Sequence, residues 1–280
     1  MLNRISLVVT TLLLAACASA APTGPASLAP HWRAEGFAQP ESVAVSADGR
    51  TLYVSNVSGE PAAKDGVGFI SRVSPQGAII EREWVKGLNA PKGMAVGGGR
   101  LYVSDVDALV VIDIARSAIV SRIAVDGARF LNDVAMAPDG AVLVSDSGGA
   151  KIYAVKDGAV SVWLADPLLS AVNGLTLEGG ALLVSTMQGK LLKVDLATRA
   201  ITTVAEGLGN GDGVSPLGGD YYLFSEWPGR IFHVTPDGAN TVLLDTREAK
   251  TLQNDFLLVD DTLYVANMLP GTVTAWKVKR

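Results

Sequence analysis

One pattern of polar and apolar positions recurs along most of the chain. Each copy has a polar residue, an apolar run, a glycine-containing turn and a second apolar run that ends in a polar residue. The copies begin at Glu41, Lys92, Asn132, Asn173, Asp212 and Asn254. Their steps are 51, 40, 41, 39 and 42 residues, and we attribute the long first step to a glycine- and charge-rich insertion near 59–68. A period near 40 residues is typical of β-propeller blades.

The composition of the apolar runs indicates strands. Runs such as Leu52-Tyr53-Val54 and Leu263-Tyr264-Val265 are rich in β-branched and aromatic residues, which strands prefer. Turns such as Asp139-Gly140 supply the positive φ angles that hairpins need. A helical solenoid of similar period is disfavoured, because the segments are short and broken by glycine. The sequence therefore predicts an all-β fold, a six-bladed β-propeller with four antiparallel strands per blade.

The two ends of the repeat indicate how the ring closes. The sixth copy has room for only three strands before the chain ends at Arg280. Residues 31–37 resemble residues 83–88, which precede the second copy. We therefore expect the N-terminal strand to complete the last blade, so that the propeller spans residues 31–280. This closure would remove the open edge that an incomplete ring exposes.

The first thirty residues predict export. Arg4 precedes an apolar stretch that is too short to span a bilayer, so residues 1–16 are typical of a signal peptide. Leu14-Ala15-Ala16-Cys17 resembles a bacterial lipobox, which predicts lipidation of Cys17, the single cysteine. Residues 17–30, rich in Ala, Pro and Ser, would then form a flexible tether.

The expected location is the periplasmic side of a bacterial membrane, attached by the lipid. The outer membrane is favoured, because Ala18 replaces the Asp linked to inner-membrane retention. The alternative is cleavage after the A-x-A sequence at 18–20, which would give a soluble periplasmic or secreted protein.

Charge narrows the range of partners. The net charge is −5 and the chain contains no basic run, which argues against nucleic-acid binding because phosphate contacts require clustered Lys and Arg. We expect a small-molecule substrate as partner, membrane contact through the lipid anchor only, and a monomer.

The polar residues that open each copy are expected to surround one mouth of the central channel. In a four-stranded meander, the start of the innermost strand and the end of the second strand lie on the same face. Two carboxylates, three amides and one lysine would therefore converge. Buried carboxylates repel each other and lose solvation, and a hard cation such as Ca²⁺, Mg²⁺ or Mn²⁺ relieves both costs.

Two other interpretations of these residues stay open at this point. The side chains could cap strand ends around a water-filled channel, or Lys92 could pair with Glu41 in place of a metal. The only histidines are His31 and His233, so a zinc site built from nitrogen and sulfur ligands is not expected.

At these residues the sequence resembles the gluconolactonase and regucalcin (senescence marker protein) family of six-bladed propellers, and more distantly paraoxonases and diisopropyl fluorophosphatase. The resemblance covers nearly all of residues 31–280 and rests on Glu41, Asn132-Asp133, Asn173-Gly174 and Asp212-Gly213, in blades one, three, four and five. It implies that Glu41, Asn173 and Asp212 bind a divalent metal, with Asn132 at or beside it. Ca²⁺ is expected first, and Mg²⁺, Mn²⁺ or an oxygen-bound Zn²⁺ are alternatives.

The resemblance also implies an activity, the metal-dependent hydrolysis of a small lactone or ester. The metal would polarise the carbonyl group, and Asp212 would act as general base or nucleophile. The candidates for substrate binding are Asn132, Arg129, Lys92, Glu226 and Trp227. Arg129 stands three residues before Asn132, whereas family lactonases place an arginine two residues before. The alternatives are a non-enzymatic, membrane-tethered binding or scaffold propeller and, more distantly, a strictosidine-synthase-like activity.

Overall fold

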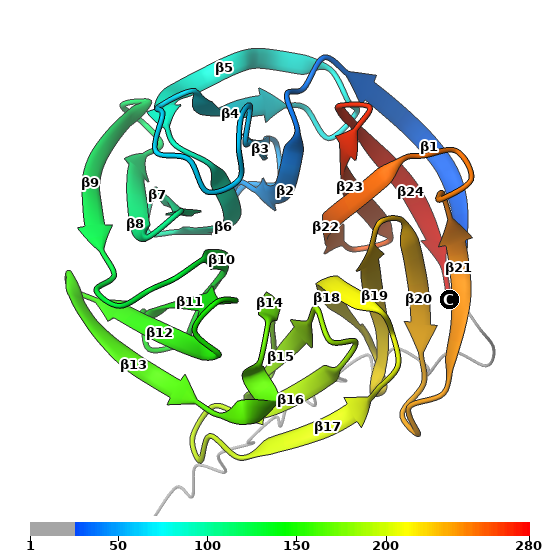
Figure 1. Ribbon diagram of the computed structural model, residues 1–280. Helices are drawn as coiled ribbons and strands as arrows, with labels where there is room; N and C mark the ends of the chain where they lie inside the picture. Colours follow the sequence, from blue (N-terminus) through cyan, green and yellow to red (C-terminus); the bar gives the residue numbers. More distant parts are fainter. Residues whose placement is uncertain (1–25) are drawn as a thin grey trace, which may run out of the picture.

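The computed structural model describes residues 26–280, which form six four-stranded antiparallel sheets around a central axis (Figure 1). The predicted six-bladed propeller is therefore confirmed. The innermost strands are β2 (Pro40–Val45), β6 (Pro91–Gly97), β10 (Leu131–Met136), β14 (Val172–Glu178), β18 (Asn210–Gly218) and β22 (Leu252–Val259). The second strands are β3 (Leu52–Asn56), β7 (Arg100–Asp105), β11 (Val142–Asp146), β15 (Ala181–Thr186), β19 (Tyr221–Trp227) and β23 (Thr262–Leu269).

The outer half of each blade follows the same order. The third strands are β4 (Gly68–Val73), β8 (Ala108–Asp113), β12 (Lys151–Lys156), β16 (Leu191–Asp195), β20 (Arg230–Val234) and β24 (Thr272–Lys279). The outermost strands are β5 (Ile79–Leu88), β9 (Ala118–Ala124), β13 (Ala159–Ala165), β17 (Ile201–Ala205), β21 (Asn240–Asp245) and, in blade six, β1 (Ser27–Glu35). A 3-10 turn, η1 (Pro167–Leu169), precedes β14.

The N-terminal strand β1 closes the ring by pairing antiparallel with β24, from Ser27 opposite Lys279 to Glu35 opposite Thr272. The strand begins four residues earlier than the sequence suggested, because Leu28 packs on the buried cluster between blades five and six. Residues 27–30 therefore belong to the sheet and not to the expected tether. The predicted signal peptide and Cys17 lie outside the described residues. Within 26–280, no helix has the length and apolar character needed to cross a membrane.

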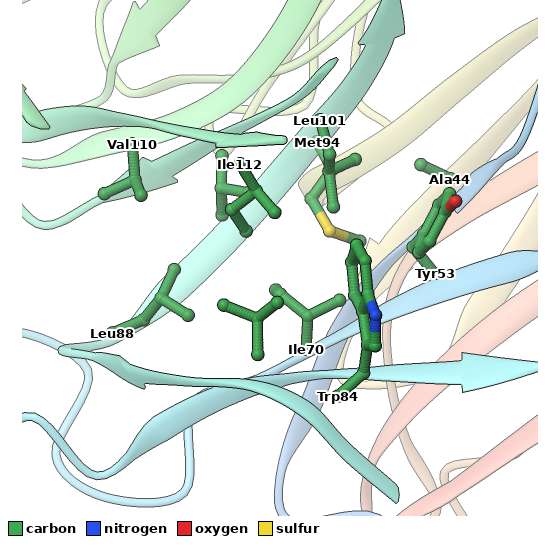
Figure 2. Close-up of a cluster of buried hydrophobic side chains, with 11 residues drawn as sticks. Ala44, Tyr53, Ile70, Trp84, Leu88, Met94, Leu101, Val110 and Ile112 are labelled. Carbon is green, nitrogen blue, oxygen red and sulfur yellow. The ribbon is translucent and has the colours of Figure 1, made fainter. Parts of the chain in front are cut away.

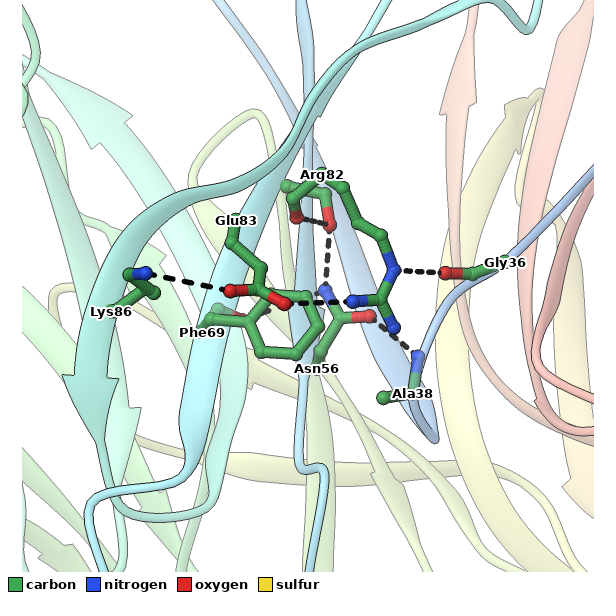
Figure 3. A network of polar contacts seen from close by, with 8 residues as sticks. Gly36, Ala38, Asn56, Phe69, Arg82, Glu83 and Lys86 are labelled. Atoms are coloured by element: carbon green, nitrogen blue, oxygen red, sulfur yellow. Dashed lines mark hydrogen bonds and ion pairs between the residues drawn. The ribbon is translucent and has the colours of Figure 1, made fainter.

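Polar contacts fix the connection between β1 and blade one (Figure 3). The Arg82 guanidinium on β5 donates to the Gly36 carbonyl at 2.5 Å and to Glu83 at 2.8 Å. The Asn56 side chain accepts the Ala38 N–H at 3.0 Å. The first and last blades are thus joined by these polar contacts as well as by the chain segment between β1 and β2.

The hydrophobic core consists of clusters between neighbouring blades. One cluster combines Tyr53, Ile70 and Trp84 of blade one with Met94 and Leu101 of blade two (Figure 2). Equivalent clusters occupy the other interfaces around the ring. Each fully buried leucine or isoleucine contributes about 1.5–3 kcal/mol, so both faces of every sheet are stabilised by packing and the inner strand ends are held rigidly.

Candidate functional site

A β-bulge interrupts the start of every innermost strand. The register with the second strand shifts between Pro40 and Val43 in blade one, and at the matching residues in the five other blades. The interrupted positions hold the polar pairs Glu41-Ser42, Lys92-Gly93, Asn132-Asp133, Asn173-Gly174, Asp212-Gly213 and Asn254-Asp255. A bulge breaks the alternation of side chains between the two faces of a strand, so both members of a pair can be turned toward the axis.

Buried serines hold these bulges in place. The hydroxyls of Ser55, Ser145, Ser185 and Ser225 each accept a bulge N–H of their own blade at 2.7–3.0 Å. Ser225 also donates to the Asn254 carbonyl of the next blade at 3.1 Å, and Ser185 donates to the Asp212 carbonyl in the same way. Ser185 and Ser225 therefore link adjacent blades at the bulges, whereas Ser55 and Ser145 bind within their own blades.

The first members of the polar pairs come together as predicted. Glu41, Lys92, Asn132, Asn173, Asp212 and Asn254 are all buried, and all line one cavity of about 190 Å³. The cavity wall is completed by Val57, Pro61, Phe130, Met187, Gly211, Trp227 and Met268. The arrangement therefore combines a polar floor with a mainly apolar wall.

The two carboxylates of this floor have no hydrogen-bond partner among residues 26–280. Burial raises the pKa of Glu41 well above its ordinary range, and the charges of Asp212 and Asp255 raise it further, while Lys92 lowers it. Burial also raises the pKa of Asp212, again with Asp255 adding repulsion. Unpaired buried carboxylates are costly, so this floor is electrostatically incomplete.

An amide oxygen beside them is unpaired as well. Asn173 donates through its side-chain nitrogen to the Gly211 carbonyl at 3.3 Å, and its Oδ1 atom is buried without a partner. Asn254 donates similarly to the Pro40 carbonyl at 3.4 Å. Interactions between blades thus orient the amides.

A second acidic layer was missed at the sequence level as a site feature. Asp133 accepts the N–H groups of Val134 and Leu175 at 2.7 and 2.6 Å. Asp255 accepts the Phe256 N–H at 2.7 Å and the Ser42 hydroxyl at 2.8 Å. Burial raises the pKa of Asp133 well above its ordinary range and that of Asp255 to about 6. These aspartates follow Asn132 and Asn254 directly, so the repeated Asn-Asp pair was the sequence signal that could have revealed them.

Lys92 does not pair with Glu41, since no ion pair joins them in the described part of the chain. Its ammonium group donates to the carbonyls of Pro61 at 2.8 Å and Ala90 at 3.0 Å and lies 4.5 Å from the centre of the Phe130 ring. Burial lowers the pKa of Lys92, and the charges of Glu41 and Asp105 oppose that effect.

The remaining candidates for substrate binding are distributed differently. Trp227 lines the cavity and is 37% exposed. Arg129 and Glu226 are not among the lining residues. The Arg129 side chain is exposed while its N–H binds Asp146 at 3.1 Å, and Glu226 pairs with Arg230 at 2.5 Å. Asp105 and Asp146 cap the chain before β6 and β10 through backbone N–H groups.

A larger hollow of about 580 Å³ lies between blades three and four, away from the axis. Its polar side chains are Asp139, Lys156, Ser161 and Arg199, all of which are exposed. Asp139 and Lys156 already form an ion pair at 2.9 Å. The smaller cavity is the candidate site, because the buried carboxylates of Glu41 and Asp212 and the unpaired oxygen of Asn173 line it.

The donors of this cavity suit a hard cation. No three His, Cys, Asp or Glu side chains within 26–280 are grouped so that they could hold a metal by themselves. The floor instead offers carboxylates from Glu41 and Asp212 together with the unpaired oxygen of Asn173. Mixed carboxylate and amide oxygens are what Ca²⁺ accepts, and Asn132 lies in the same lining.

Comparison with known proteins gives the fold. No protein-family model and no curated protein sequence matches the chain. A streptogramin B lyase structure is similar, with a TM-score of 0.66 and 12% identity over 91% of this chain and 98% of that chain. A candidate gluconolactonase solved by structural genomics has a TM-score of 0.65 and 19% identity over 92% and 93%.

A third similar structure is a catalytically inactive variant of virginiamycin B lyase from Staphylococcus aureus with quinupristin, with a TM-score of 0.62 and 14% identity over 90% and 99%. At these identities the likeness concerns the fold. The fold resemblance to a gluconolactonase-type propeller, expected from the sequence, is confirmed by the second of these structures.

Proposed function

We propose that this propeller is a divalent-metal-dependent hydrolase of a small lactone or ester, with Ca²⁺ the expected metal. The observation that carries the proposal is the pair of buried, unpaired carboxylates beside the unpaired Asn173 oxygen. A divalent cation would neutralise Glu41 and Asp212 and would bind this oxygen, so one ligand removes three separate costs. Mg²⁺, Mn²⁺ or Zn²⁺ bound by oxygens are the alternative metals.

When bound, the cation would polarise the carbonyl group of the substrate. Glu41, Asn173 and Asp212 would hold it, and the Asn132 amide would orient the substrate from the cavity lining. As general base, Asp212 takes a proton from the attacking water as the water oxygen bonds to the carbonyl carbon. The ring or ester C–O bond then breaks, and the leaving oxygen receives that proton. Direct attack by Asp212 as a nucleophile is the other route.

The wall of the cavity supports a small substrate. Val57, Phe130, Met187 and Met268 provide apolar contacts, and the volume is about 190 Å³. An apolar wall restricts water and strengthens the electrostatic interactions of the floor.

Metal content and thermal unfolding test the proposal. We expect about one tightly bound divalent ion and a higher unfolding temperature with Ca²⁺, because a ligand of the folded state stabilises it. Asp212→Asn should abolish both effects and reduce kcat for lactones or esters at least a hundredfold. Asp139→Asn, on the flank of blade three, is the matched control and should behave as the unmodified protein. Retained activity and metal binding in Asp212→Asn would refute the mechanism.

Lyase chemistry like that of the similar structures has less support in this site. The inactive virginiamycin B lyase variant replaces a histidine by alanine. In this chain His31 is exposed on β1 and His233 lies on β20, stacked on Tyr221, and neither lines the cavity. A hydrolase that uses Asp212 therefore fits these residues better.

The second candidate function is a non-enzymatic binding or scaffold propeller. The observation in its favour is that Arg129 and Glu226, two of the five expected substrate contacts, do not line the cavity. A bound metal without hydrolysis of a broad lactone and ester panel would favour this alternative.

We further propose that the protein acts as a monomer on the periplasmic side of a bacterial membrane, held by lipid on Cys17. Replacement Cys17→Ser should move the protein from the membrane fraction to the soluble fraction, because a lipid chain provides the attachment. Unchanged fractionation of Cys17→Ser would contradict lipid anchoring and favour the cleaved, soluble alternative.

A further inference from the structure

Lys92 is a buried cation without an anionic partner. It is 3% exposed, and no carboxylate forms an ion pair with it within the described residues. Among the lining residues of the axial cavity it alone is positively charged. A buried charge is normally paired, so the position of Lys92 in the polar floor of the cavity requires an explanation.

The hydrogen bonds of Lys92 fix its position but use only part of its capacity. Two of its N–H groups bind the carbonyls of Pro61 and Ala90, and the ammonium group lies against Phe130. An ammonium group has three donors, so one donor is free. Because neutral carbonyls do not balance a full charge, the site is preorganised for an anion.

The neighbouring carboxylates are already committed. Asp105, which acts on Lys92 electrostatically, binds the N–H groups of Asn89 and Ala90 and lies 3.3 Å from Arg122. Asp133 and Asp255 bind backbone and hydroxyl donors and do not line the cavity.

The two carboxylates that do line the cavity, Glu41 and Asp212, are the groups that the proposed cation would use. With the cation in place, the lining would carry one positive charge in excess, located on Lys92. An anionic group of the substrate would restore the balance.

We propose that Lys92 binds a carboxylate on the substrate, so that the substrate class is small lactones or esters that carry an acid group. This inference rests on the proposed function, since it assumes that the cation occupies Glu41 and Asp212. The substrate carbonyl and its carboxylate would thus contact different charges, which fixes the orientation of the molecule in the cavity.

The opposing explanation is that Lys92 only fastens the insertion over the cavity. Residues 57–67 connect β3 to β4, and Pro61 of this segment accepts a hydrogen bond from Lys92. The same segment has a second tie, the 2.5 Å ion pair of Lys64 with Asp107, which is exposed. Lys64→Met therefore loosens the segment without changing the charge of the cavity and is the matched control.

The test compares γ-butyrolactone with the same lactone bearing a γ-carboxylate, each with Ca²⁺ present. We expect the unmodified protein to favour the carboxylated lactone at least tenfold in kcat/KM. Lys92→Met should lower the ratio of the two kcat/KM values at least tenfold, mainly through KM for the acid. Lys92→Arg should keep part of the preference, and Lys64→Met should keep the full ratio. An unchanged ratio in Lys92→Met, or an equal loss in Lys64→Met, would overturn the inference.

A binding measurement separates this inference from the proposed function. If the unmodified protein hydrolyses neither lactone, the hydrolase proposal fails for this class, and thermal unfolding with Ca²⁺ and the carboxylated lactone decides the role of Lys92. Stabilisation of the unmodified protein and Lys64→Met, but not of Lys92→Met, would support anion binding. Equal shifts in all three proteins, or no shift in any, would overturn it.

Discussion

At the scale of single residues, the Glu41 carboxylate lowers the stability of the metal-free fold, and the same carboxylate is a proposed metal ligand. Its carboxylate is buried, unpaired within residues 26–280, and repelled by Asp212 and Asp255. Such conflicts are typical of sites that bind a ligand at the expense of stability.

Replacement Glu41→Gln should therefore have opposite effects on stability and metal binding. In EDTA we expect the free energy of unfolding of the variant to exceed that of the unmodified protein by about 1 kcal/mol or more. The reason is that the variant has no buried charge to be desolvated or repelled. Its affinity for Ca²⁺ should fall at least tenfold. Chemical denaturation and calcium titration measure the two effects. A metal-free variant that is less stable would argue for a structural role of Glu41.

The acidic layer also predicts how the stability of the metal-free protein depends on pH. Burial raises the pKa of Asp255 to about 6, while the unfolded chain has an ordinary value of about 4. The folded state then binds more protons than the unfolded state between these values, so the free energy of unfolding falls as pH rises through this window. The loss is on the order of 1–3 kcal/mol.

Denaturation in EDTA between pH 4 and 8 measures this slope, and Asp255→Asn removes both the titration of Asp255 and its repulsion of Glu41 and Asp212. The variant keeps an acceptor for Ser42 but does not titrate, so its slope should be less negative. His233 acts in the opposite direction. Burial lowers its pKa, so its contribution to the free energy of unfolding increases as pH rises toward the ordinary histidine pKa. Both proteins contain His233, so its contribution cancels when the slope of one is subtracted from the slope of the other. Identical slopes would show that Asp255 has no raised pKa.

At the scale of elements, the bulges depend on close contacts between backbones of neighbouring blades. Gly174 on β14 follows the proposed ligand Asn173, and a methyl group there would overlap the Asp212 carbonyl oxygen. The carbon of this methyl group would also lie 2.9 Å from the Ser185 hydroxyl oxygen. Only a residue without a side chain allows these two strands to meet.

We expect Gly174→Ala to lower the free energy of unfolding by about 1–3 kcal/mol through overpacking, and to weaken metal binding by displacing Asp212. Gly180, in the turn between β14 and β15, has open space around it. Gly180→Ala should leave stability unchanged or raise it slightly. Thermal unfolding of the pair, with and without Ca²⁺, measures both effects. Equal behaviour of the two variants would contradict the close approach.

The bulges also mark the limit of prediction from the sequence. The repeat spacing placed Glu41, Lys92, Asn132, Asn173 and Asp212 in one ring, and all of them line the cavity. Alternation of side chains along an ordinary strand turns Asp133 and Asp255 away from Asn132 and Asn254, so the second acidic layer was not expected. The positions of Arg129 and Glu226 outside the cavity lining depend on local contacts with Asp146 and Arg230. The repeat pattern does not predict such contacts.

At the scale of the whole molecule, the ring was predicted from the six copies of the repeat. Its closure was predicted from the sixth copy, which has room for only three strands before the chain ends. Closure places β1, in blue, beside β24, in red (Figure 1). Trp32 of β1 packs 5.8 Å from Tyr264 and donates to the Pro75 carbonyl at 2.9 Å. The sequence placed the start of this strand four residues too late, at residue 31, because proline and alanine in 27–30 resemble a linker. These residues pair with β24.

Closure predicts that residues 26–35 are required for a stable monomer. A chain that begins at residue 26 should unfold as the full chain does, because β1 is intact. A chain that begins at residue 36 would leave the edge of β24 unpaired and would expose apolar residues of two inter-blade clusters. We expect it to unfold at a lower temperature and to associate through the free edge, which size-exclusion chromatography would detect. A synthetic peptide of residues 26–37 should restore the monomer by strand addition, whereas a peptide of the same composition in scrambled order should not. A monomeric, fully stable shorter chain would mean that the ring is held by the interfaces between blades alone.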